Sequence, residues 1–113
     1  MISEKTRELL TKAQSYQQQI QLLMAQKEAI NAQLIELKKA LEELRKTKET
    51  EVYRISGPIL LKSKKPEVEK DLKEKENLLS GRLKTIETNE KSVKGKLDEL
   101  REDISKTDIK GAR

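Results

Sequence analysis

Hydrophobic residues recur every three or four positions through the first part of the chain, from about residue 3 to residue 48. Only Thr6 and Lys27 interrupt the series with a polar side chain, and the stretch contains no proline and no glycine. A spacing that averages 3.5 residues over many turns is typical of a helix in a left-handed coiled coil. We therefore expect a helix over about 3–48, with Ser3 as its N-cap. The apolar members of the series are Ile2, Leu9, Ala13, Tyr16, Ile20, Leu23, Ile30, Leu34, Leu37, Leu41 and Leu44.

A second stretch with helical spacing begins after Pro66 and is interrupted only by Glu76 and Glu90. Proline is well suited to the first turn of a helix, where its missing N–H is not needed. We expect a helix over about 66–105, followed by a flexible tail over 106–113. The apolar members of this second series are Val68, Leu72, Leu79, Leu83, Ile86, Val93, Leu97, Leu100 and Ile104.

Between the two helices the pattern changes to that of a β-hairpin. Gly57 and Pro58 mark a turn, and β-branched and aromatic residues on either side predict strands over about 52–56 and 59–63. A lone two-stranded hairpin is marginally stable and leaves open edges. We therefore expect the hairpin to assemble with copies or relatives of itself; the alternative is a tight loop that only caps the helices. The predicted assembly residues are Val52, Tyr53, Ile55, Gly57, Ile59, Leu60 and Leu61.

Together these segments predict a mainly α fold, with a single domain over residues 1–113. The two helices pair as an antiparallel coiled coil, and the β-hairpin forms the turn between them. With the turn near Gly57, residues whose numbers add to about 115 face each other. This register brings Lys27 close to Glu90, and we predict that the two charges pair and help to fix the alignment. The alternative is that each side chain extends to water by itself.

Composition narrows the classes of function. Charged residues make up 40% of the 113 residues and aromatic residues only 2%, which excludes a thick globular core. Disorder is the compositional alternative, and the sustained helical spacing argues against it. The chain has no cysteine and no histidine, so a disulfide or a zinc site of the usual kind is excluded. We expect no catalytic residue, cofactor or metal, and no enzymatic activity.

The distribution of apolar and basic residues bears on location and partners. No apolar run approaches the roughly 20 residues that span a bilayer, and the N-terminus lacks the apolar stretch of a secretory signal. We therefore expect a cytoplasmic protein without a membrane partner. Residues 52–66 carry Arg54, Lys62, Lys64 and Lys65 and no acidic side chain. A nucleic-acid site is one interpretation of this cluster, but protection of a strand edge is the commoner use, so no nucleic acid is expected.

The order helix, hairpin, helix resembles the prefoldin (GimC) family, in particular its archaeal beta-type subunits. The hairpin from Val52 to Lys62 is similar to the family pattern Tyr-Lys-x-x-Gly-x-hydrophobic-hydrophobic-x-Lys. The resemblance covers nearly the whole chain. Its other parts are Tyr16-Gln17-Gln18-Gln19-Ile20-Gln21-Leu22, Gln26-Lys27, Lys38-Lys39-Ala40-Leu41-Glu42-Glu43-Leu44, Asp71-Leu72-Lys73-Glu74-Lys75 and Leu83.

The resemblance implies a chaperone subunit. Prefoldin hairpins join into a β-barrel platform, usually of two alpha-type and four beta-type subunits. The coiled coils hold non-native client proteins at their tips without ATP, and the clients pass to a group II chaperonin. The alternative function is a structural or filament-forming coiled coil that assembles through the same hairpin. Apolar residues at both ends of the chain are the candidate client-binding tips: Ile2, Leu9, Leu10, Leu97, Leu100, Ile104 and Ile109.

Overall fold

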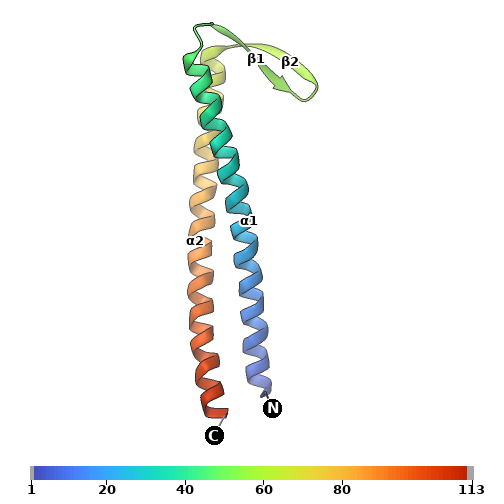
Figure 1. Cartoon of the computed structure of the whole chain (residues 1–113), viewed down its shortest axis with the longest axis vertical. Helices are drawn as coiled ribbons and strands as arrows, with labels where there is room; N and C mark the ends of the chain where they lie inside the picture. The colour runs from blue at the N-terminus through green and yellow to red at the C-terminus, as the bar shows by residue number, and fades with distance from the viewer. Residues whose placement is uncertain (1, 112–113) are drawn as a thin grey trace. The chain divides into compact units, whose positions relative to one another are not determined.

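The secondary structure consists of two long helices with a β-hairpin between them (Figure 1). A computed structural model describes residues 2–111, and the surroundings of side chains for residues 2–107. In chain order the elements are α1 (Glu4–Lys46), β1 (Glu51–Ser56), β2 (Ile59–Lys64) and α2 (Lys65–Gly111). The predicted mainly α fold is therefore confirmed, while the joining of hairpins into a barrel stays a prediction.

Ser3 caps the N-terminus of α1. Its Oγ accepts a hydrogen bond from the backbone N–H of Thr6 at 3.1 Å, as expected for an N-cap. The two hydroxyl oxygens also lie 2.8 Å apart in a hydrogen bond. Thr6 is buried, and this bond explains how a polar residue is tolerated in the apolar series.

The buried positions of α1 reproduce the predicted series. From Thr6 to Leu44, each position of the series is buried or half-buried, and each other position in that range is exposed. The chain divides into two compact units, and each is built around this series and its counterpart in α2. Unit 1 comprises residues 1–28 and 84–113, and unit 2 comprises residues 29–83. The buried apolar side chains are Leu97 and Leu100 in unit 1, and Leu34, Leu41 and Leu44 in unit 2.

The hairpin lies in unit 2 and has the expected register. β1 and β2 are antiparallel, and their partners run from Glu51 opposite Lys64 to Ser56 opposite Ile59, so that paired numbers add to 115. Gly57 has a φ of +59°, a conformation that costs glycine little. A positive φ at the first turn residue and a proline at the second fit the tight II′ turn that matches the twist of hairpin strands.

The C-terminal end of α2 lies beyond the expected position. The helix continues to Gly111, so the end predicted near residue 105 is wrong, and residues 106–111 of the expected tail are helical. No proline or glycine precedes Gly111 in this segment. The hydroxyl of Thr107 donates to the carbonyl of Asp103 at 2.8 Å, within the helix. No helix-breaking residue therefore stops α2 before Gly111.

Two glycines inside α2 offer a test of helix stability. A Cβ at Gly81 or Gly95 would meet no atom within 4 Å. Because alanine favours a helix interior by about 1 kcal/mol over glycine, Gly81→Ala and Gly95→Ala should each raise the free energy of unfolding by about that amount. Urea denaturation followed by circular dichroism would measure it. A loss of stability in either variant would contradict the presence of open space at that glycine.

Candidate interaction surfaces

One face of the hairpin is open and apolar. Tyr53, Ile55 and Leu60 share it, because side chains alternate along a strand and Ile55 is paired with Leu60. These three side chains are 65%, 79% and 62% exposed. We call them the open hairpin face. Lys62 and Glu51 lie on the same side and form an ion pair at 2.7 Å.

The opposite face of the hairpin is only partly covered. Val52 and Arg54 are half-buried there, but Ile59 and Leu61 remain exposed. The hairpin therefore exposes apolar side chains on both faces, as the run Ile59-Leu60-Leu61 predicted. Exposed apolar groups gathered in this way are typical of interaction sites. The sequence interpretation in which these residues only cap the helix pair does not account for their exposure.

An ion pair ties the hairpin to the start of α2. The Arg54 guanidinium donates from Nη1 to Asp71 Oδ2 at 2.8 Å. At the base of the hairpin, Lys65 donates from its backbone N–H to the Thr50 carbonyl and from Nζ to the Thr47 carbonyl, both at 2.9 Å. These contacts hold the hairpin in one orientation within unit 2. They also engage Arg54 and Lys65, two of the four residues in the basic cluster.

Glu69, in the second turn of α2, accepts from two cations. Arg45 Nε lies 3.4 Å and Lys73 Nζ 3.5 Å from Glu69 Oε1. Partial desolvation raises the pKa of Glu69, but the hydrogen bonds and charges of Arg45 and Lys73 outweigh it, so the pKa lies below its ordinary value. The charged form of Glu69 is thus favoured in the folded chain.

The lowered pKa of Glu69 predicts a pH-dependent contribution to stability. A carboxyl whose pKa is depressed by folding stabilises the fold above its unfolded pKa, about 4.3 for glutamate. That stabilisation is lost as the pH falls through the lower folded value. Glu69→Gln should therefore destabilise the chain at pH 7 and have little effect at pH 3. Urea denaturation of both proteins at the two pH values would measure this, and an equal difference at both would contradict it.

The residues predicted as client-binding tips differ in exposure. Ile2 and Leu10 are exposed, and Leu9 and Ile104 are half-buried. In contrast, Leu97 and Leu100 are buried in the core of unit 1. The side chain of Ile109 lies outside the described residues. The structure therefore does not gather these seven residues into one exposed patch, because two of them already pack inside the unit.

Lys27 and Glu90 lie together in unit 1. Lys27 Nζ is 3.5 Å from Glu90 Oε1, and Glu90 is buried, with 8% of its surface exposed. Lys94, which was not part of the predicted pair, lies 3.6 Å from the same oxygen. The buried carboxylate is thus shared by two lysines, one from each helix. This arrangement gives the charge a partner inside an otherwise apolar series.

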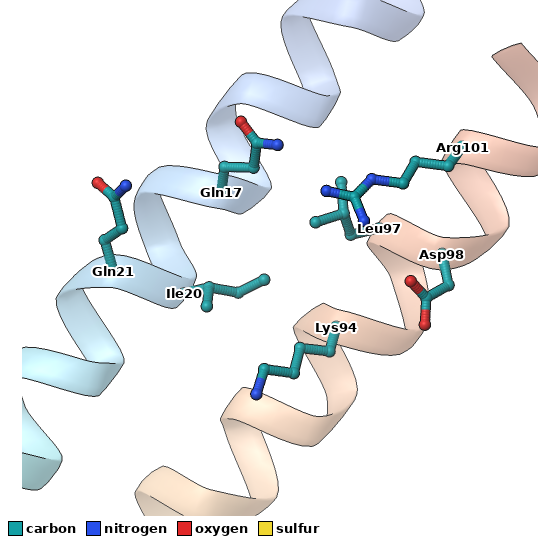
Figure 2. Close-up of a pocket in the computed structure, with 7 residues that line it drawn as sticks. All are labelled: Gln17, Ile20, Gln21, Lys94, Leu97, Asp98 and Arg101. Carbon is teal, nitrogen blue, oxygen red and sulfur yellow. The ribbon is translucent and has the colours of Figure 1, made fainter.

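Two grooves flank the helix pair of unit 1. The first has a volume of about 530 Å³ and the second of about 320 Å³, within the range of about 300–1,000 Å³ usual for ligand clefts. Side chains of both helices line each one. The first groove is lined by Gln17, Ile20, Gln21, Lys94, Leu97, Asp98 and Arg101 (Figure 2). The second is lined by Gln19, Leu22, Leu23, Gln26, Asn89, Ser92, Val93 and Lys96.

The sequence did not predict these grooves, although some of the residues that line them had been noted for other reasons. Gln17, Gln19 and Gln21 were noted only because they lie in a segment that resembles a known family. Their positions beside the apolar series were the available signal: Gln17 and Gln21 follow series members, whereas Gln19 precedes one. On a helix, residues that follow members of the apolar series lie on one side of it, and residues that precede them lie on the other. The two sets therefore face opposite grooves.

The part of the chain that the structure describes contains neither a cluster of metal-ligating residues nor a membrane-spanning helix. Within residues 2–111, no three residues among histidine, cysteine, aspartate and glutamate are grouped so that they could hold a metal ion. Neither α1 nor α2, over these same residues, is apolar enough along its length to cross a membrane.

Comparison with known proteins connects this architecture to one family. The family described as "Prefoldin subunit" matches residues 7–107. The prefoldin subunit beta of Thermococcus onnurineus is 38% identical over 104 residues, 91% of this chain and 90% of that protein. The beta subunit of Pyrococcus furiosus is 36% identical over 104 residues, 91% of this chain and 89% of its own length. The crystal structure of the prefoldin beta subunit from Thermococcus strain KS-1 aligns with a TM-score of 0.88 at 35% identity, over 95% of both chains.

Proposed function

Because the chain belongs to the prefoldin subunit family, whose members are chaperones, we propose that it is a holdase subunit. It binds non-native proteins without ATP and passes them to a group II chaperonin. Membership also implies assembly with other prefoldin subunits, and the resemblance to archaeal beta-type subunits is confirmed. The observation that carries the proposal is the hairpin, which exposes apolar side chains on both faces.

The proposed assembly joins the hairpins of two alpha-type and four beta-type subunits into a closed β-barrel. Each chain offers a two-stranded sheet, and no other strand among residues 2–111 pairs with either of its outer edges. Closing a ring of such sheets pairs every edge and buries apolar side chains inside the barrel. The filament alternative uses the same contacts in an open-ended series, which forms when the rotation between neighbours does not close.

The proposed client contacts lie at the ends of the two helices in unit 1. Ile2 and Leu10 are exposed there and are available to an apolar segment of a client. Leu97 and Leu100 are buried, so they reach a client only when the helices separate locally. Holding a client in this way requires apolar surface and no catalytic group, in keeping with the absence of histidine and cysteine.

The proposal is tested by separating assembly from client holding. The chain and a candidate alpha-type subunit are mixed, and the mass is measured by sedimentation. The mixture is then assayed for suppression of aggregation of an unfolded protein. A chain without residues 1–9 and 101–113 should assemble to the corresponding mass and lose most of the suppression, because the tips are gone.

A milder variant controls for damage by truncation. Ile2→Ser with Leu10→Ser removes only exposed apolar side chains and should reduce suppression without changing the mass. Full suppression by the truncated chain would move the client site away from the tips. Open-ended growth of the chain by itself would favour the filament.

A further inference from the structure

We propose that the two grooves of unit 1 hold extended segments of non-native polypeptide by pairing their glutamine amides with the backbone of that segment. This inference rests on the proposed chaperone function and names what the chaperone recognises. The recognised feature is an unpaired peptide backbone rather than a particular side chain. It differs from the apolar tips both in place and in chemistry.

The first groove has an apolar floor and a polar border. Figure 2 shows Ile20 of α1 and Leu97 of α2 pointing between the helices, whereas Gln17 and Gln21 lie on α1, with the side chain of Gln21 directed away from α2. Lys94 and Arg101 extend from α2 toward α1 in the same view. Hydrophobic side chains of a bound segment would rest on the floor, while its backbone runs past the amides at the border.

The spacing of the amides matches an extended chain. Gln17 and Gln21 are four residues apart on a helix, a rise of about 6 Å. In an extended strand, backbone groups that point to the same side recur every two residues, about 6.4–6.8 Å. If an extended segment lies along α1, two successive backbone groups on one of its sides can therefore hydrogen-bond to Gln17 and Gln21.

The amide group suits recognition without sequence preference. A glutamine side chain both donates and accepts hydrogen bonds, so it can pair with a backbone N–H or a C=O. Among the described residues, no hydrogen bond within the protein occupies the side chains of Gln17, Gln21 or Gln26. Native proteins already pair most of their backbone groups internally, whereas extended non-native segments present theirs to any partner.

The second groove also combines apolar and amide side chains, on the other side of the apolar series, with a wider spacing between its amides. Its floor contains Leu23 and Val93, and its border contains Gln19, Gln26 and Asn89. Leu22, which is 60% exposed, lies in this groove. Gln19 donates from Nε2 to Ser15 Oγ at 3.5 Å, so Leu22 has the unoccupied amide of Gln26 beside it as the hydrogen-bonding group. A helical client segment would not use these amides, because its backbone is already paired.

The test replaces the amides with methionine, a side chain of similar size that has no hydrogen-bond donor and only a weak acceptor. The variant Gln17→Met with Gln21→Met keeps helix propensity and adds apolar surface. The control Gln14→Met with Gln18→Met has the same spacing on exposed positions that line neither groove. The probe is a fluorescent peptide of leucine, threonine and serine that is unstructured when free. A second version carries N-methyl groups on alternate backbone nitrogens.

Binding is measured by fluorescence anisotropy with the full chain in its assembly with an alpha-type subunit. The Gln17→Met/Gln21→Met variant should bind the peptide roughly tenfold more weakly, the effect of losing about two exposed hydrogen bonds. The control should bind as the wild type does. The N-methylated peptide should bind the wild type weakly and lose little further affinity in the variant.

The outcomes distinguish this inference from the proposed function. If the wild type suppresses aggregation but the variant binds as tightly as, or more tightly than, the wild type, the grooves act by apolar contact and the inference is overturned. Equal binding of a helical amphipathic peptide to wild type and variant, together with no binding of the unstructured peptide, would also overturn it. If the wild type neither binds the peptide nor suppresses aggregation, the proposed function itself fails.

Discussion

Replacing both Ile59 and Leu61 with lysine should abolish assembly while leaving the helices folded. The two side chains are 57% and 47% exposed in the single chain, so they contribute little to its own stability. In an assembly each would be buried, with a gain of about 1.5–3 kcal/mol per side chain. Losing both, and adding two charges near Arg54, should weaken association by more than about a hundredfold. Sedimentation velocity would show smaller species, and circular dichroism would show retained helix.

The chain offers a matched control for this experiment. Ile35 and Leu78 are 55% and 57% exposed, close to the exposure of Ile59, but they lie on the helices. Ile35→Lys with Leu78→Lys adds the same charge at the same exposure and should leave the mass of the assembly unchanged. If the hairpin variant also keeps the full mass, the hairpin is not the assembly element and the proposed function loses its structural basis.

The pair formed by Lys27 and Glu90 should show energetic coupling in a double-mutant cycle. Lys27→Met leaves Glu90 buried with Lys94 as its remaining partner, so this substitution should be the more costly one. Glu90→Leu leaves Lys27, whose side chain is 37% exposed and can reach water. The double mutant should be at least as stable as either single mutant, with a coupling of about 1–2 kcal/mol.

Chemical denaturation of the four proteins would measure the coupling. A surface pair provides the control: Lys46 and Glu43 lie 4.0 Å apart with side chains 73% and 79% exposed, and exposed pairs couple weakly. Lys46→Met and Glu43→Leu should therefore be nearly additive. Additivity at Lys27 and Glu90 as well would show that the two charges act independently, and their predicted role in fixing the alignment of the helices would be wrong.

The pattern of apolar residues predicted much of this architecture. In α1, the positions that repeat at a spacing of 3.5 are those the structure buries from Thr6 to Leu44, because a coiled coil places only this series against its partner. The position of Gly57 predicted the hairpin register. In an antiparallel helix pair, the numbers of facing residues have a constant sum, and the position of the turn gives that sum. The turn at Gly57 therefore also predicted that Lys27 lies near Glu90.

The candidate sites were less predictable, for a physical reason. Membership in an apolar series predicts contact with a partner helix, so it cannot also predict exposure at the chain ends. Leu97 and Leu100 were assigned to client binding on composition and position, yet their series membership already predicted the burial that the structure has. The grooves depend on side chains from both helices at once, and neither helical pattern alone reveals which glutamines border an open space.

The division into two units has a consequence for the order in which the molecule forms. Unit 2 is continuous in sequence, from residue 29 to residue 83, whereas unit 1 joins two segments from opposite ends of the chain. Contacts between distant segments require closure of a longer loop, and they form more slowly than local ones. Unit 2 can therefore fold first and shorten the loop that unit 1 must close. During synthesis, residues 1–28 emerge long before residues 84–113. The apolar face of the first helix therefore lacks its partner in unit 1 until residues 84–113 have been made.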